Sequence, residues 1–123
     1  MKQLEYCNHA DRVVIKLLVN AILHKGYSIT VFDGEEHTLT GCYERAKIFE
    51  ALTSTGEDHI ILEAKDGLRE GWFHLIYDNG SEDEPLVVIS DHTDNAICNL
   101  IYASVEAELE HYELRWVKKG SKL

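Results

Sequence analysis

Asp91-His92-Thr93-Asp94 is the densest group of potential metal ligands in the sequence, and it falls at a predicted strand-to-helix junction. Carboxylate and imidazole groups suit a divalent cation, and an ion held by Asp91, His92 and Asp94 would support hydrolysis. The same residues also fit a helix cap followed by first-turn acids, which the helix dipole stabilises. The seven histidines form no His-x-x-x-His pair, and no Cys-x-x-Cys occurs. No metal or other cofactor is therefore expected, and the metal-dependent hydrolase is kept as an alternative.

His59 and His74 form a second candidate, whose geometry depends on one turn. If Asp66-Gly67 is a two-residue hairpin turn, Lys65 lies opposite Leu68 and His59 lies opposite His74. Such a cross-strand pair would bind a metal or respond to pH. A longer loop would shift the register and separate the two rings. The simpler interpretation is that both are half-exposed strand residues without a special role.

Three cysteines, Cys7, Cys42 and Cys98, do not resemble a catalytic or disulfide-bonded set. An odd number cannot pair completely, and the first residues lack the pattern of a secretory signal. No nucleophile elbow, cysteine-enzyme signature or phosphate-binding glycine motif occurs near them. We therefore expect free thiols in a reducing cytoplasm, with Cys98 packed in the core.

Charge is distributed unevenly along the chain. Lys and Arg number 12 against 22 Asp and Glu, which gives a net charge of −10. Ten of the acids and no Lys or Arg fall between Asp78 and Glu113, whereas residues 115–123 carry four basic residues and no acid. Nucleic-acid binding requires clustered basic residues, so no direct nucleic-acid contact is expected.

Two groups of acids within this stretch are predicted to form a partner-binding surface. One group occupies a surface loop, and the other lies on one face of a helix at spacings i, i+4 and i+7. Charge of one sign favours a partner with a basic surface. The alternative is that the acids only keep the protein soluble. The residues are Glu82, Asp83 and Glu84 in the loop, and Glu106, Glu110 and Glu113 on the helix.

Periodicity and turn residues predict the elements that position these groups. Apolar residues at helical spacing, alternating strands and Asp-Gly or Asn-Gly turns indicate the order α-β-α-β-β-β-α. The predicted fold is a single α+β domain over residues 1–123, with a flexible basic tail at 115–123. A four-stranded, mostly antiparallel meander is packed by two long helices and one short helix. Helices are expected at about 10–25, 43–53 and 93–112, strands at about 27–32, 58–65, 71–78 and 86–91, and a turn or short extended piece at 35–40.

The first predicted helix is unusually apolar. Asn8 is predicted to cap it and Gly26 to end it. Its apolar stripe covers more than half of the circumference, so Leu17 and Leu18 are both expected to be buried, within the monomer or at a homodimer seam. The apolar run is too short to span a bilayer, and no membrane contact is expected.

Four stretches resemble small uncharacterised proteins encoded by bacteriophages and mobile elements. They are Gly26–Glu36, residues 46–58, Leu75–Gly80 and Val88–Asn95, and the resemblance covers most of the chain. It implies the cytoplasm of a bacterial host as the setting. It implies no activity and no role for any residue.

Three classes of function follow. The first is a small acidic interaction module that binds, and by binding modulates or inhibits, a basic host protein. The second is a self-assembling homodimer that uses the first helix as its seam. The third is the hydrolase at Asp91, His92 and Asp94.

Overall fold

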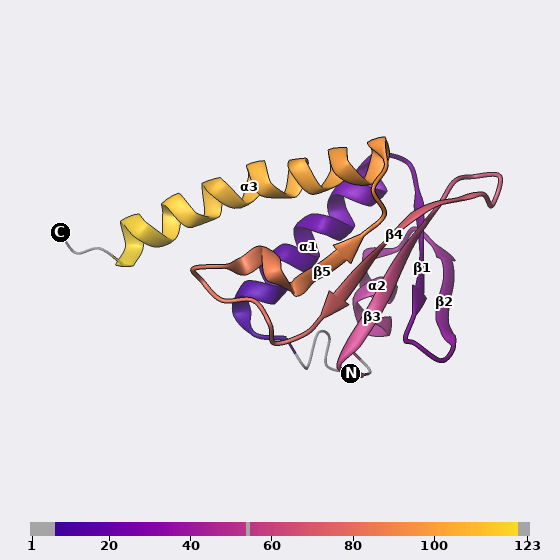
Figure 1. Cartoon of the computed structure of the whole chain (residues 1–123), viewed down its shortest axis with the longest axis horizontal. Helices are drawn as coiled ribbons and strands as arrows, with labels where there is room; N and C mark the ends of the chain where they lie inside the picture. Colours follow the sequence, from indigo (N-terminus) through magenta and orange to yellow (C-terminus); the bar gives the residue numbers. More distant parts are fainter. Residues whose placement is uncertain (1–6, 54, 121–123) are drawn as a thin grey trace.

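The computed structural model describes residues 7–53 and 55–120, with side chains described as far as His111 (Figure 1). The fold is α+β, as predicted, but its order is α-β-β-α-β-β-β-α, with one strand more than expected and a 3-10 turn before the last strand. The elements are α1 (His9–His24), β1 (Ser28–Phe32), β2 (His37–Cys42), α2 (Arg45–Ala51), β3 (Glu57–Glu63), β4 (Arg69–Ile76), η1 (Pro85–Val88), β5 (Ile89–His92) and α3 (Ala96–Gly120).

One antiparallel sheet organises the molecule, with the strands in the order β2-β1-β3-β4-β5. The helices pack on one face of this sheet and leave the other face open (Figure 1). Strand residues alternate between these faces, so every second side chain enters the core. The core contains Ile29, Val31, Ile60, Leu62, Phe73 and Leu75 from the strands, and Ile15, Leu18, Ile22, Ile48 and Ile101 from the helices.

Helix α1 is the central helix of the core, and its ends are as predicted. The Asn8 side chain caps it by accepting a hydrogen bond from the Asp11 amide, and Gly26 follows its last turn with a φ of 91°. Leu18 is fully buried, but Leu17 is only partly buried, because it faces outward beside α3. No helix in the described residues combines the length and the apolar composition that crossing a membrane requires.

Three predicted elements differ from the structure. The piece expected to be a turn or a short extended segment, residues 35–40, is extended from His37 and belongs to β2, an exposed edge strand of the sheet that lacks an alternating apolar pattern. The strand expected at 86–91 is shortened because Pro85 starts the 3-10 turn η1. Helix α3 begins at Ala96 rather than Thr93, because the Asn95 side chain accepts from the Cys98 amide and caps it. It also continues to Gly120 instead of ending at Tyr112, so it includes the first part of the stretch predicted as a flexible tail.

The β3–β4 hairpin reaches the predicted register by a different route. Ala64 pairs with Leu68 around a three-residue loop, Lys65–Gly67, in which Gly67 has a φ of 86°. A bulge at Glu70 then adds one residue to β4, so that Leu62 pairs with Gly71 and His59 with His74. The extra loop residue and the extra bulge residue together restore the alignment that a two-residue turn would give.

The bulge is also where helix α3 meets the sheet. The Asn95 side chain donates to the Glu70 carbonyl at 2.8 Å. A Cβ atom at Gly71 would lie 2.5 Å from the Cys98 sulfur, so only glycine permits this approach of helix and strand. Cys98 is buried as expected, and the three cysteines are free thiols.

Candidate functional site

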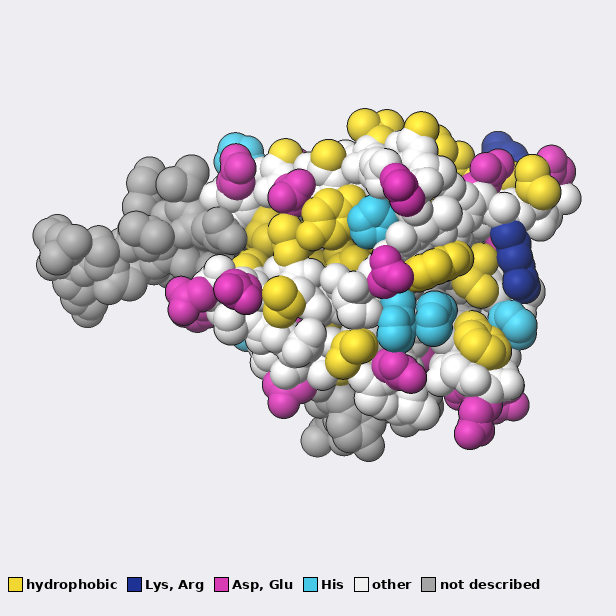
Figure 2. All heavy atoms as spheres, viewed as in Figure 1, with side chains coloured by type: hydrophobic (Ala, Val, Ile, Leu, Met, Phe, Trp, Pro, Cys, Tyr) yellow, Lys and Arg dark blue, Asp and Glu magenta, His cyan; other side chains and the backbone are white. Residues whose placement is uncertain are grey.

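The open face of the sheet carries a cluster of five aromatic and imidazole rings. We call Phe32, His37, His59, Trp72 and His74 the ring cluster; they come from four adjacent strands. Figure 2 looks onto this face and shows histidine side chains beside hydrophobic ones at its centre. Trp72 is 36% exposed and Ile76, further along the same strand and face, is 37% exposed. Exposed apolar side chains gathered on one face are typical of a binding surface.

Strand register brings the rings together. Phe32 pairs with His37 on one side and with His59 on the other, and His59 pairs with His74. The His59 and His74 rings are stacked, with centroids 4.2 Å apart and an interplanar angle of 6°. Trp72 meets His59 edge-on at 5.8 Å. The rings therefore form one continuous surface rather than isolated side chains.

His74 is held in place by hydrogen bonds from both ring nitrogens. The Ser90 hydroxyl lies 2.9 Å from Nδ1, and Glu57 lies 2.9 Å from Nε2. A neutral ring satisfies both if Ser90 donates to Nδ1 and Nε2–H donates to Glu57. These contacts fix the plane of His74 and therefore the plane on which His59 stacks.

His59 is kept neutral by its surroundings. Burial and the neighbouring His74 lower the pKa of His59 below its usual value, although Glu57 opposes this. Its Nδ1 atom is buried and has no hydrogen-bond partner among the described residues. Protonation of His59 would place a positive charge in this partly buried stack, so acidification below the usual histidine range is expected to loosen the stack.

Ser90, His74 and Glu57 have the order of a hydroxyl–imidazole–carboxylate triad. In a catalytic triad the hydroxyl faces Nε2 and the carboxylate faces Nδ1, whereas the roles are reversed here. Ser90 lies in the edge strand β5, where its hydroxyl is also 3.3 Å from the His74 carbonyl, a weaker alternative acceptor for its one proton. This geometry supports a positioning role for Ser90 and Glu57.

The residues predicted as metal ligands do not converge. Asp91 is exposed and pairs with His74 on the open face, whereas His92 pairs with Phe73 and points to the helical side, where its ring contacts Phe73 and Tyr102. Asp94 accepts a hydrogen bond from Asn99 at 3.0 Å. The described residues contain no group of three potential metal-ligating side chains. Strand alternation, which places neighbours on opposite faces, separates the first two.

The predicted acidic surface is exposed where the structure describes it. Glu82, Asp83 and Glu84 lie in the exposed loop between β4 and η1, and Glu106 and Glu110 lie on the exposed side of α3. The three ion pairs found among the described side chains involve none of them. Glu113 belongs to α3, but its side chain lies outside the described residues. Both groups lie toward the end of the molecule where α3 extends beyond the sheet (Figure 1).

Sequence patterns pointed to only part of this site. The His59–His74 pair is recognisable from the hairpin sequence. Phe32 joins it through the pairing of β1 with β3, which are distant in sequence. His37 joins it through the pairing of β1 with β2, which no sequence pattern marks as a strand. The sequence feature that indicated the ring cluster is the presence of bulky side chains on both faces of the strand around Trp72.

No family model, curated protein or solved structure matches the chain.

Proposed function

We propose that this chain is an acidic protein-interaction module that binds a basic protein through the open face of its sheet. The observation that carries the proposal is the ring cluster, a continuous set of side-chain rings on a face that no described helix covers. Aromatic side chains at the centre of an interface commonly supply most of its binding energy.

The border of the ring cluster indicates the chemistry of the partner. The exposed carboxylates of Glu57 and Asp91 lie on either side of His74, and Trp72, two residues before His74 on the same face of β4, presents an accessible ring. Arg69, whose guanidinium lies 3.4 Å from the His37 ring, is already paired with Glu63 at 3.1 Å. An arginine of a partner satisfies this arrangement best, because its guanidinium stacks on aromatic rings and binds carboxylates at its edge.

The acidic loop at Glu82–Glu84 supports the same choice of partner. Unpaired carboxylates raise the rate at which a basic surface encounters the molecule. The resemblance to phage-encoded proteins makes a bacterial host protein the proposed target, whose activity is modulated when its basic surface is covered.

A capture experiment with matched variants tests the proposal. The immobilised chain is exposed to bacterial lysate at neutral pH in low and in high salt, and bound proteins are quantified by mass spectrometry. A protein with a basic surface is expected to bind the parent in low salt. Trp72→Ser, and separately Glu57→Gln with Asp91→Asn, are expected to reduce its capture at least tenfold, about 1.4 kcal/mol.

Leu68→Ser is the matched control, because Leu68 is 60% exposed at the hairpin tip and lies outside the ring cluster. Circular dichroism shows whether each variant is folded. If folded Trp72→Ser captures the same proteins as the parent, in the same amounts, the open face is not the contact surface and the proposal is wrong.

A further inference from the structure

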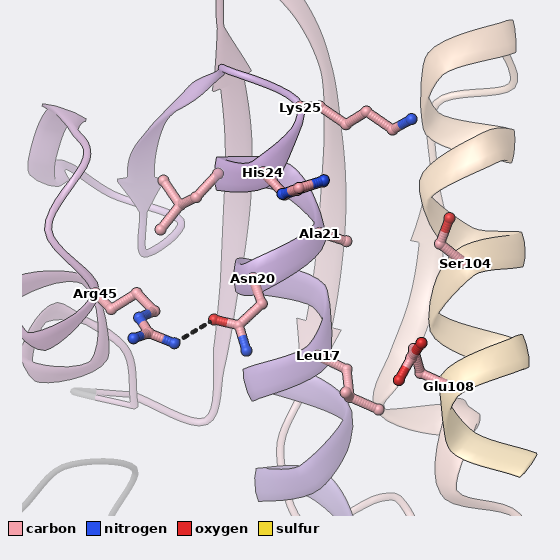
Figure 3. A pocket seen from close by; sticks show the side chains of 9 residues that line it. Leu17, Asn20, Ala21, His24, Lys25, Arg45, Ser104 and Glu108 are labelled. Carbon is pink, nitrogen blue, oxygen red and sulfur yellow. Dashed lines mark hydrogen bonds between the residues drawn. The ribbon is translucent and has the colours of Figure 1, made fainter. Parts of the chain in front are cut away.

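A larger groove, on the helical side of the molecule, has charged groups that do not meet. It has a volume of about 670 Å³ and lies over α1, between the start of α2 and the middle of α3 (Figure 3). Arg45, bonded to Asn20 at 2.8 Å, lies on one side of α1, and Glu108 lies on the other. These groups therefore do not converge on one ligand. The apolar lining comes from three partly buried residues, Leu17, Ala21 and Leu23.

A smaller hollow lies beside Trp72 on the open face, next to the ring cluster. It has a volume of about 310 Å³, and most of its lining is apolar. Trp72 and its partner in the β3–β4 pairing, Ile61, line it from the sheet, and Arg69 and Thr93 contribute to its border. A hollow of this size and lining suits one apolar side chain, the kind of anchor that interfaces seat in pockets.

The hollow follows from where strand β5 ends. Its last residue, His92, pairs with Phe73, so residues 69–72 of β4 have no β5 residue opposite them. Thr93 is bonded to this part of β4 instead. The Trp72 amide donates to the Thr93 hydroxyl at 3.0 Å, and the Thr93 amide donates to the Trp72 carbonyl at 3.1 Å. The border is therefore fixed before a partner arrives, which lowers the entropic cost of binding.

We propose that the partner inserts an apolar side chain into the hollow beside Trp72, two residues away from the arginine that it places over His74. This inference rests on the proposed function, and it adds the sequence pattern that the partner carries. The charge complementarity lies at His74, which the exposed carboxylates of Glu57 and Asp91 flank. The apolar complementarity lies at the hollow.

The spacing follows from strand geometry. Trp72 and His74 lie on the same face of β4. They are about 7 Å apart along the strand, because a strand rises about 3.3 Å per residue. An extended segment of the partner laid along β4 has the same rise, so its side chains at positions i and i+2 meet the hollow and His74. The pattern is one apolar residue and one arginine with a single residue between them, in either order.

Ile76 lies at the same spacing on the other side of His74, next to a second hollow of about 640 Å³. An apolar side chain seated in that hollow would take carboxylates out of water, which costs free energy. The apolar residue of the partner is therefore assigned to the Trp72 side. The carboxylates that border the second hollow are those of Asp33, Glu35 and Glu57.

Short peptides with blocked ends test the pattern without the natural partner. Gly-Ser-Leu-Ser-Arg-Ser-Gly and Gly-Ser-Arg-Ser-Leu-Ser-Gly carry the two residues at the required spacing, in both orders. Gly-Ser-Ser-Leu-Arg-Ser-Gly places them on opposite sides of an extended segment, and a fourth peptide has serine in place of leucine. Titration into the ¹⁵N-labelled chain at neutral pH, followed through the NMR signals of Trp72 and Thr93, measures the dissociation constants.

At least one spaced peptide is expected to bind about fivefold more tightly than the adjacent and the leucine-free peptides, because only the spaced leucine is buried in the hollow. Absence of binding by both spaced peptides at millimolar concentration overturns the inference, and so does equal binding of the spaced and adjacent peptides. This comparison uses the parent chain, so it is decisive whether or not a given variant folds.

Ile61→Ser removes an apolar wall of the hollow and is expected to abolish the preference for leucine. Val87→Ser is the matched control, because Val87 is 36% exposed and does not line the hollow. A preference that survives Ile61→Ser in a folded chain, or that is lost in Ile76→Ser instead, overturns the assignment to the Trp72 side. If the inference fails while capture of the basic protein still depends on Trp72, the proposed function stands without it.

Discussion

Asp58 is a carboxyl group buried on the helical side of the sheet, and its effect on the free energy of unfolding depends on pH. Its side chain is fully buried and accepts hydrogen bonds from the Tyr77 hydroxyl and the Thr53 amide through Oδ2, while Oδ1 has no partner among the described residues. Burial raises the pKa of Asp58 to about 6, although the two hydrogen bonds oppose the rise. Ionised Asp58 is therefore destabilising in the folded state.

Replacement of Asp58 by Asn should change how stability depends on pH. Because the folded pKa is raised, the stability that Asp58 contributes is fully present below its unfolded pKa of about 4 and is lost as pH rises through 6. Between pH 4 and pH 7, the parent is expected to lose about 2–3 kcal/mol relative to Asp58→Asn. Urea unfolding across this range measures the difference. Parallel profiles for the two proteins would show that Asp58 does not titrate there.

At the scale of elements, the two leucines in the middle of α1 test how the helix is buried. Leu18 is fully buried in the core, whereas Leu17 lies in the groove and is partly buried. Leu18→Ala is expected to lower the free energy of unfolding by about 2–5 kcal/mol, as core leucine truncations do. Leu17→Ala is expected to cost less than half as much in the monomer. Denaturant unfolding of the monomeric variants measures both losses of unfolding free energy. Equal losses for Leu18→Ala and Leu17→Ala would contradict the placement of α1.

Local signals determined which elements were predictable. The caps of α1 and the antiparallel order of β3, β4 and β5 followed from Asn8, Gly26 and the turn residues, because these act within a few positions. Strand β2 has two partly buried residues, Leu39 and Cys42, which are three positions apart, so no alternating pattern marks it as a strand. The sheet order, with β1 placed between β2 and β3, is a long-range property that no single segment contains.

The candidate site shows the same division. The alignment of His59 with His74 was predicted, but on the condition of a two-residue turn that the structure does not have. The alignment holds because a bulge compensates for the longer loop, and a bulge leaves little trace in one sequence. Asp91, His92 and Asp94 look like a cluster because they are close in sequence, but strand alternation separates Asp91 from His92, and Asp94 lies beyond the end of β5.

Across the whole molecule, charge is separated by region. Among the described side chains, cations concentrate on α1 and α2, and the stretch from Asp78 to Glu110 is acidic. Long-range charge of this kind acts on association rates more than on folding. The acidic loop should therefore influence how fast a basic partner arrives.

Reversal of Glu82, Asp83 and Glu84 to lysine should slow association with the basic partner captured by the parent, and should flatten its dependence on salt. Folding should be unaffected, because these side chains are exposed. Surface plasmon resonance at several salt concentrations measures the association rate. Reversal of Glu35, Glu36 and Glu50 controls for net charge. Equal association rates for the parent and the loop variant would leave solubility as the role of the loop.

Glu70 also bears on how this chain tolerates changes in length. Eight residues separate the paired Leu62 and Gly71, and a three-residue loop with two regular pairs needs only seven. A chain that lacked Glu70 would therefore keep the ring cluster aligned. It would lose the carbonyl to which Asn95 donates at the start of α3. Deletion of this single residue would thus leave the alignment of the open face unchanged, and would weaken the attachment of α3 on the opposite side of the sheet.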